Sequence, residues 1–222
     1  MPALPAILLF LIGLPSLPAA GAERDASGIF LVAKREMRDF RFREAVVLVT
    51  QPREGGPVGV IINKPLAHRL AEAFPGRETL KNKRDVIYFG GPVAPQGLVV
   101  LLRAENAPPN AVRILKDVFL ITDPDVIDEL LRRDDPTRGL RVYAGYSGWA
   151  PGQLQGELAR GDWHVVPADP GTVFDKPSRS VWPELERRAT TKHTHTREIV
   201  RAGDRERENR APALTRSRPP VF

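Results

Sequence analysis

The apolar residues of this chain are gathered in short runs rich in β-branched side chains, and this spacing limits the fold more than any other feature. The runs are five to seven residues long: GIFLVA (28–33), AVVLVTQ (45–51), VGVIIN (58–63), DVIYF (85–89), GLVVLL (97–102), VFLIT (118–122), LRVYAGY (140–146) and WHVVPAD (163–169). Such runs are typical of strands and too short for helices. Because many follow one another without an intervening helix, the sequence predicts an α+β fold with a largely antiparallel or mixed sheet.

Helical signals are fewer and stand between or after these strands. Asp123 followed by Pro124 is typical of an N-cap and a proline in the first helical turn. Four helices are predicted: 66–74, 124–131, one that begins at Pro151 or Gly152, and 180–189. The few helices therefore accompany a sheet that makes up most of the domain.

The first 22 residues, MPALPAILLFLIGLPSLPAAGA, carry no charged side chain and have an apolar centre at 6–14. This length is typical of the hydrophobic region of a signal peptide, and the small residues at 20–22 suit a cleavage site. The sequence predicts that residues 1–22 are removed and that the protein is periplasmic or secreted. Two alternatives stay open, because no Lys or Arg precedes the apolar centre: an uncleaved anchor, or a start codon assigned too early in a cytoplasmic protein.

The positive charge of the chain lies in its last segment. Of the 33 Lys and Arg and 27 Asp and Glu, residues 187–222 contain 10 and 4, so the rest of the chain is balanced and the net charge of +6 belongs to this segment. The sequence predicts a single domain at 23–186 and a disordered basic tail at 187–222. A neutral domain gives no reason to expect specific nucleic-acid binding, although the tail could contact an anionic surface weakly.

The stretch YAGYSGWAPGQLQGELARGDW (143–163) combines a serine with glycines, but its spacing does not suit catalysis. A nucleophile elbow needs G-x-S-x-G, whereas the glycine after Ser147 comes one residue early. The chain contains neither a G-x-x-x-x-G-K-[ST] phosphate loop nor a G-x-G-x-x-G fingerprint. It has no cysteine, and His193 and His195 have no third ligand nearby in the sequence. The sequence therefore predicts no enzymatic activity, cofactor or metal.

The same stretch is explained by a corner between a strand and a helix. Leu154 and Leu158 are four residues apart and would face the core. Gly161 is placed to end the helix in a left-handed conformation. Trp149 and Trp163 flank the helix and would bury large side chains.

Three motifs resemble the YqgE/AlgH family of bacterial proteins: GVIINKP (59–65), FGGPV (89–93) and GYSGWAPGQLQGEL with the following DW (145–163). The resemblance covers about residues 28–185. It implies a bifurcated, mostly antiparallel sheet curled into a pseudo-barrel with a few peripheral helices. It also implies a usually cytosolic protein without established enzymatic activity, for which a role in transcription has been inferred in some members.

These observations predict a non-catalytic module that binds a ligand or a partner of unknown identity. The expected ligand surface combines a polar strand end, a Gly-Gly turn and the N-terminus of a helix, which could bind an anion: Asn63, Lys64, Gly90, Gly91, Gly152 and Gln153. Two alternatives are a regulator linked to transcription and, less favoured, a hydrolase that uses Ser147. The oligomeric state and the pathway are not indicated.

Overall fold

A computed structural model describes residues 28–50 and 56–191. Three segments lie outside the described residues: 1–27, which includes the predicted signal peptide, 51–55, and 192–222, which includes most of the predicted tail. No helix within the described ranges is long and apolar enough to cross a membrane.

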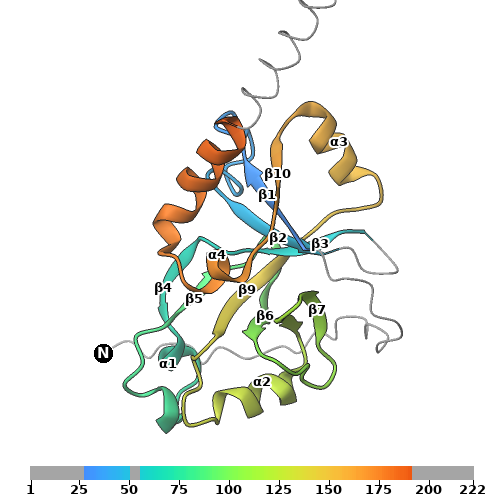
Figure 1. The fold of residues 1–222 in the computed structure, drawn as a ribbon. Helices are drawn as coiled ribbons and strands as arrows, with labels where there is room; N and C mark the ends of the chain where they lie inside the picture. Colours follow the sequence, from blue (N-terminus) through green and yellow to red (C-terminus); the bar gives the residue numbers. More distant parts are fainter. Residues whose placement is uncertain (1–27, 51–55, 192–222) are drawn as a thin grey trace, which may run out of the picture. The chain divides into compact units, whose positions relative to one another are not determined.

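Ten strands form one continuous sheet (Figure 1). They are β1 (Ile29–Ala33), β2 (Val46–Thr50), β3 (Val58–Ile61), β4 (Pro65–Arg69), β5 (Val86–Phe89), β6 (Val93–Arg103), β7 (Val112–Leu115), β8 (Val118–Ile121), β9 (Leu140–Gly148) and β10 (Trp163–Pro167). The main path runs β10-β1-β2-β3-β9-β6-β8-β7, and β4 and β5 form a branch beside β9. The predicted strands are all present, and β2 and β3 pair antiparallel.

The branch explains why the sheet is bifurcated. Along one edge, β9 pairs antiparallel with β6. Along its other edge, β9 first pairs in parallel with β5, where Tyr88 faces Tyr143, and then antiparallel with β3, where Gly59 faces Ser147. This β5–β9 contact is the only parallel pair among the described strands, so the prediction of a mostly antiparallel, mixed sheet is confirmed.

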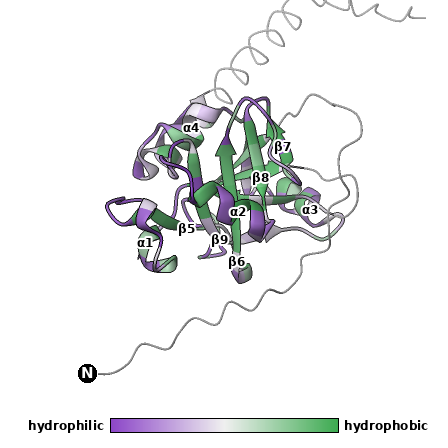
Figure 2. Cartoon of the chain, turned by 90° about the horizontal axis from the view of Figure 1, so that it is seen from below, coloured by the Kyte–Doolittle hydropathy of each residue, from purple (hydrophilic) through white to green (hydrophobic). Residues whose placement is uncertain are grey.

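The two ends of the main path approach each other through Gly28. Its backbone N–H donates to the carbonyl oxygen of Ile114 in β7 at 3.0 Å, and its carbonyl accepts from Ala168 after β10 at 3.3 Å. The start of β1 thereby connects both edge strands. The sheet curls into the half-barrel that the family resemblance implies, with helices at its periphery (Figures 1 and 2).

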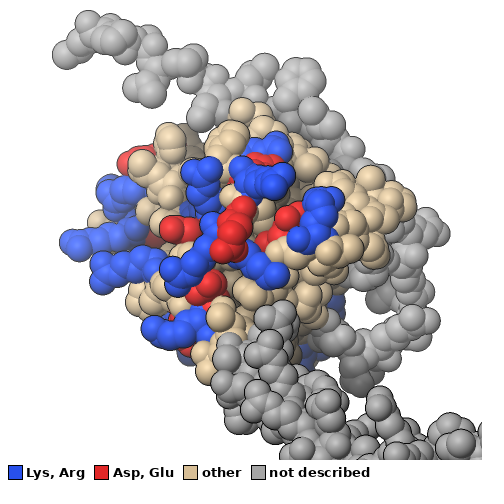
Figure 3. Space-filling model, turned by 90° about the horizontal axis from the view of Figure 1, so that it is seen from above, with Lys and Arg blue, Asp and Glu red and all other residues tan. Residues whose placement is uncertain are grey.

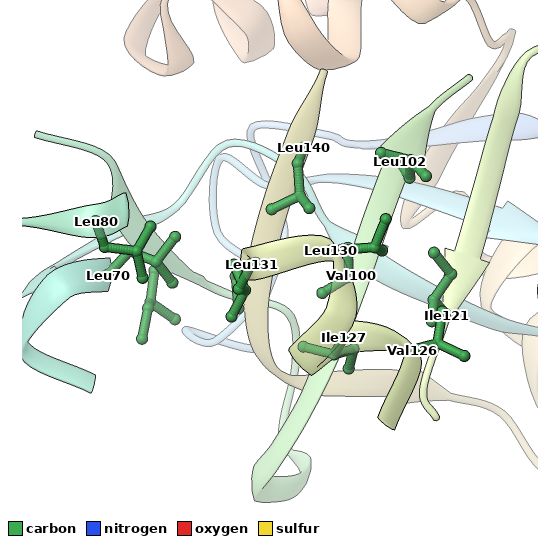
Figure 4. Close-up of a cluster of buried hydrophobic side chains, with 12 residues drawn as sticks. Leu70, Leu80, Val100, Leu102, Ile121, Val126, Ile127, Leu130, Leu131 and Leu140 are labelled. Carbon is green, nitrogen blue, oxygen red and sulfur yellow. The ribbon is translucent and has the colours of Figure 1, made fainter. Parts of the chain in front are cut away.

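The second helix, α2 (Pro124–Leu131), covers one face of the sheet and follows the predicted pattern closely. Asp123 Oδ1 accepts from the backbone N–H groups of Asp125 and Val126, which caps the helix. The buried side of α2 packs on β6, β8 and β9, while its outer side is hydrophilic (Figures 2 and 4). The four apolar residues on the inner side of α2 are all buried: Val126, Ile127, Leu130 and Leu131.

Residues 66–74 differ from the predicted single helix. Residues Pro65–Arg69 form β4, which pairs antiparallel with β5, and only Leu70–Ala73 form the helix α1. Leu66, Leu70 and Phe74 still pack on the same core, because a strand that turns into one helical turn can also direct them there. Pairing with β5 thus overrides the helical spacing, which is only a weak local preference in so short a segment.

Three short elements are not indicated by the sequence patterns: β7, the 3₁₀ turn Glu78–Leu80 and α4 (Pro170–Phe174). The closing helix begins at residue 178 and continues to residue 191 in the described part of the chain. Residues 187–191 are therefore helical, as the predicted helix at 180–189 indicates in part, and the first compact unit ends at Glu186, at the predicted domain boundary. Leu185 is buried in the core, and the residues at 187–189 are Arg and Ala, which have high helix propensity and continue the helix.

The closing helix is attached to the end of β1 by polar contacts. Arg35 Nε donates to Glu186 Oε1 at 2.9 Å, and the indole N–H of Trp182 donates to the carbonyl oxygen of Ala33 at 2.7 Å. The hydrogen bond and charge of Arg35 lower the pKa of Glu186 below its ordinary value of 4.5. The ionised form of Glu186 therefore stabilises the fold through this contact.

In the Glu186→Gln variant, the free energy of unfolding should depend less on pH in the acid range. Because the folded pKa of Glu186 lies below the unfolded one, its stabilisation is present above about pH 4.5 and is lost as the pH falls through the folded value. Urea unfolding between pH 7 and pH 3 should show a smaller decrease in the variant than in the wild type. Glu105→Gln, at an exposed glutamate, is the control, and parallel curves for wild type and Glu186→Gln would contradict the assignment.

Candidate functional site

The corner at residues 143–163 is held together by one carboxylate. Glu157, in the helix α3 (Gln153–Arg160), accepts the indole N–H of Trp149 and that of Trp163 on the same oxygen, Oε2, each at 2.9 Å. Its other oxygen accepts from Gln153 Nε2 at 3.0 Å. Both indole rings are buried, as expected. The composition of the corner is thus explained by a network that fixes α3 on the sheet.

The helix α3 also begins and ends as the sequence indicates. Gly152 precedes it with φ of 80°, and Gly161 follows it with φ of 81°, both in the left-handed region. Leu154 is buried in the core beside β1, β2 and β3, and Leu158 packs partly against the same core. The interpretation of this stretch as a strand-to-helix corner is confirmed.

Ser147 lies inside the corner and takes part in its construction. The residue is only 1% exposed, and its hydroxyl donates to the carbonyl oxygen of Gly90 at 3.2 Å. His68 is exposed on β4 and His164 lies on β10, whereas His193 and His195 are outside the described residues. No group of three or more metal-binding side chains occurs in the described part of the chain.

Asn63 and Lys64, predicted to contact a ligand, bind the segment 39–44 instead. The side chain of Asn63 accepts from the backbone N–H of Val46 at 2.8 Å and donates to the carbonyl oxygen of Glu44 at 2.9 Å. Lys64 Nζ donates to the carbonyl oxygen of Arg41 at 2.8 Å, and partial burial lowers its pKa. These two residues therefore hold the segment 41–46 in position.

Gly90 and Gly91 let two backbone segments approach each other. Gly90 donates to the carbonyl oxygen of Ala144, and its own carbonyl accepts from Ile61. A Cβ atom on Gly91 would lie 2.4 Å from the carbonyl carbon of Tyr146. The FGGPV motif is therefore a contact between the turn after β5 and the middle of β9.

Gly152 and Gln153, the remaining predicted ligand residues, lie exposed at the start of α3. Gln153 Oε1 accepts from the backbone N–H of Ala150 at 3.1 Å, which precedes the helix, and no side chain caps α3 itself. The backbone N–H of Gln153 donates to the carbonyl oxygen of Ala150 at 3.0 Å, which satisfies one N–H of the first turn. The carboxylate of Glu157, which accepts from the Gln153 side chain, places a negative charge nearby.

A cleft of about 720 Å³, here called the corner cleft, lies between residues 34–42 and α3. Phe42, Trp149 and Trp163 contribute aromatic surface, and the rings of Phe42 and Trp163 meet edge to face at 5.6 Å. The charges balance locally, because Arg41 pairs with Asp39 at 2.6 Å and Arg160 pairs with Asp162 at 2.8 Å. Figure 3, which looks down on the end where α3 lies, likewise shows both signs of charge side by side.

The predicted residues surround this cleft more than they line it. Only Gln153 lines it directly, whereas Asn63 and Lys64 support the wall at 39–44 from behind. Gly91 allows its segment to lie close to β9, and the next residue, Pro92, lines the cleft. The sequence pattern indicated the surroundings of the cleft but not the segment 34–42, which forms one of its walls. The one pattern in that segment that could indicate a binding surface is the pair Phe40 and Phe42 within a charged run.

Comparison with known proteins agrees with the motifs and the fold. A model of the AlgH-like family (DUF179) matches residues 30–194. The chain belongs to the AlgH-like family. It is 37% identical over 175 residues to a UPF0301 protein of Methylococcus capsulatus, which covers 77% of this chain and 93% of that relative. A UPF0301 protein of Mycobacterium tuberculosis is 34% identical over 175 residues, which covers 77% of this chain and 85% of the relative.

Two solved structures share the fold of this AlgH-like protein. The solution structure of AlgH from Pseudomonas aeruginosa matches with a TM-score of 0.59 and 28% identity, over 76% of this chain and 92% of that chain. The crystal structure of protein DIP2367 from Corynebacterium diphtheriae matches with the same TM-score and identity, over 76% and 90%. The predicted family and fold class are confirmed.

Proposed function

We propose that this AlgH-like protein is a non-catalytic binding module whose partner surface is the corner cleft and its rim. The observation that carries the proposal is the exposure of Phe40, 74% of whose surface is accessible beside the cleft. Its neighbours Asp39 and Arg41 both line the cleft. Val93, which follows the lining residue Pro92, is 36% exposed. We take these two exposed apolar side chains and the aromatic lining of the cleft together as one apolar surface, of the kind that marks interaction sites.

The chemistry of the corner cleft favours a polypeptide partner over a small anion. Its aromatic surface, its buried Met37 and its arginines are the residue types enriched in protein interfaces. The ion pairs of Arg41 and Arg160 leave little excess positive charge, and Glu157 adds a carboxylate. A segment with an apolar anchor beside Phe40 and charges of both signs would match this surface.

The position of Ser147 supports a non-catalytic role. A nucleophilic serine needs a base within hydrogen-bond reach and access for its substrate. The Ser147 hydroxyl is buried and donates to a backbone carbonyl oxygen. A role linked to transcription would be compatible with partner binding, but the paired charges of the corner cleft do not favour direct contact with DNA.

Site-specific photo-cross-linking tests the proposal in the full-length protein. A photoreactive phenylalanine analogue at position 40 or 93 should give the same discrete cross-linked partner in the producing bacterium. Lys81, an exposed position on the 3₁₀ turn, provides the control, where this product should be absent. No product at 40 and 93, or the same product at 81, would contradict the proposal.

A further inference from the structure

A second cleft lies where the sheet divides, and it shares no lining residue with the corner cleft. The strands β5 and β9 pair only at Tyr88–Tyr143 and Phe89–Ala144. Before this point β5 pairs with β4 alone, and residues 140–142 of β9 pair with β6 alone, so the facing edges of β5 and β9 are unpaired there. The space between them is here called the fork cleft. It has a volume of about 920 Å³ and is closed on further sides by the loop after α2 and the end of α4.

The lining of the fork cleft contains five arginines from four parts of the chain: Arg84, Arg103, Arg133, Arg138 and Arg141. Arg103 is neutralised by Asp117 at 2.9 Å and by Asp175 at 3.2 Å. Among the described residues, the other four form no ion pair within 4 Å, although Arg138 and Arg133 contribute more distantly to the lowered pKa of Asp135, behind the direct contact of Lys83.

Two of these four arginines are held in place by groups that do not cancel their charge. Arg133 donates to the carbonyl oxygens of Leu130 and Pro136, at 3.0 and 3.2 Å. Arg141 donates to the carbonyl oxygen of Phe174 at 3.2 Å and lies 4.9 Å from the centre of the Tyr88 ring. Such contacts orient guanidinium groups before a ligand arrives, which lowers the cost of binding.

The aspartates of the cleft do not balance this charge. Asp135 is paired with Lys83 at 2.6 Å, and Asp175 with Arg103. Asp85 and Asp134 have no ion pair in the described part of the chain and oppose the four arginines. Because Asp117 and Asp175 share the single charge of Arg103, one positive charge is left over in the cleft and its paired neighbours. At the apex of the fork, the buried hydroxyl of Tyr143 also has no hydrogen-bond partner among the described residues.

We propose that the fork cleft binds the dianionic phosphoryl group of a small phosphorylated ligand. The four arginines that form no ion pair among the described residues supply the positive charge that the two negative charges of a phosphate monoester need at neutral pH. Guanidinium groups present paired N–H donors that fit phosphate oxygens. Arg84 comes from the β5 side and Arg138 from the β9 side, so a bound phosphoryl group would join the two branches of the sheet.

Calorimetric titration of the full chain with glycerol 2-phosphate at low ionic strength tests this site. The expected dissociation constant at pH 7.5 is about 1 mM or tighter. Arg84→Gln combined with Arg138→Gln should weaken binding by at least about tenfold. Arg43→Gln, which removes an exposed arginine elsewhere, is the matched control and should leave binding unchanged. Circular dichroism should show that all variants fold.

The pH and a competing ligand class separate the possible outcomes. Since the second pKa of a phosphate monoester is about 6, the affinity should fall by roughly tenfold between pH 7.5 and pH 5. Inorganic phosphate should compete for the site. No binding, equal loss in Arg43→Gln, or succinate binding as tightly as glycerol 2-phosphate would overturn the proposal. None of these results depends on the corner cleft, so the two proposals fail separately.

Discussion

Gly91→Ala should destabilise the fold by about 3 to 5 kcal/mol. The added Cβ would lie 2.4 Å from the carbonyl carbon and oxygen of Tyr146 and 2.5 Å from the backbone nitrogen of Ser147. These are backbone atoms of β9, which cannot rotate away as a side chain can. The φ angle of 151° adds strain for any residue with a side chain. Urea unfolding of the purified variant measures the loss.

Gly152→Ala separates the clash from the effect of the backbone conformation. Gly152 has φ of 80°, but a Cβ added there would meet no atom within 4 Å outside the adjacent backbone. Its replacement should therefore cost only about 1 kcal/mol. Equal losses in Gly91→Ala and Gly152→Ala would contradict the close approach between the turn after β5 and β9.

Glu157→Leu should destabilise the fold by about 2 to 4 kcal/mol, because it removes the acceptor of two buried indole N–H groups. Trp149 and Trp163 are only 6% and 5% exposed, so solvent would replace these hydrogen bonds poorly. Glu157→Gln keeps one acceptor oxygen and should cost clearly less. Urea unfolding followed by tryptophan fluorescence compares the two variants.

A double substitution shows whether the loss comes from the indole groups. Trp149→Phe removes one of the two donors, so it should cost less in the Glu157→Leu protein than in the wild type. The coupling energy between the two positions should be about 1 kcal/mol or more. Independent, additive losses would show that Glu157 does not hold the corner through Trp149.

Local patterns predicted those elements whose stability is decided locally. Asp123 and Pro124 define the start of α2 because the cap and the proline act within one turn. Gly161 ends α3 for the same reason. Residues 66–69 were predicted wrongly, because their partner strand β5 lies about twenty residues further along the chain and is not encoded in their own spacing.

The clefts depend on contacts that a single sequence does not display. The corner cleft combines residues 34–42 with residues 148–163, and Lys64 and Asn63 support it through backbone carbonyl groups. The fork cleft arises because β5 and β9 pair with each other at only two positions, Tyr88–Tyr143 and Phe89–Ala144. Away from these positions, β5 pairs only with β4 and residues 140–142 of β9 pair only with β6. Neither depends on a motif. The glycine-rich motifs instead mark where backbones meet, as at Gly91.

The affinity of the partner captured at position 40 tests the central claim, that the corner cleft binds and does not catalyse, most directly. Calorimetry would compare the wild type with Phe40→Ser and with Ser147→Ala. Removing an exposed aromatic anchor should weaken binding by more than about tenfold, whereas the buried Ser147 hydroxyl should matter little for binding. Unchanged affinity in Phe40→Ser, or turnover of the partner that Ser147→Ala abolishes, would contradict the account.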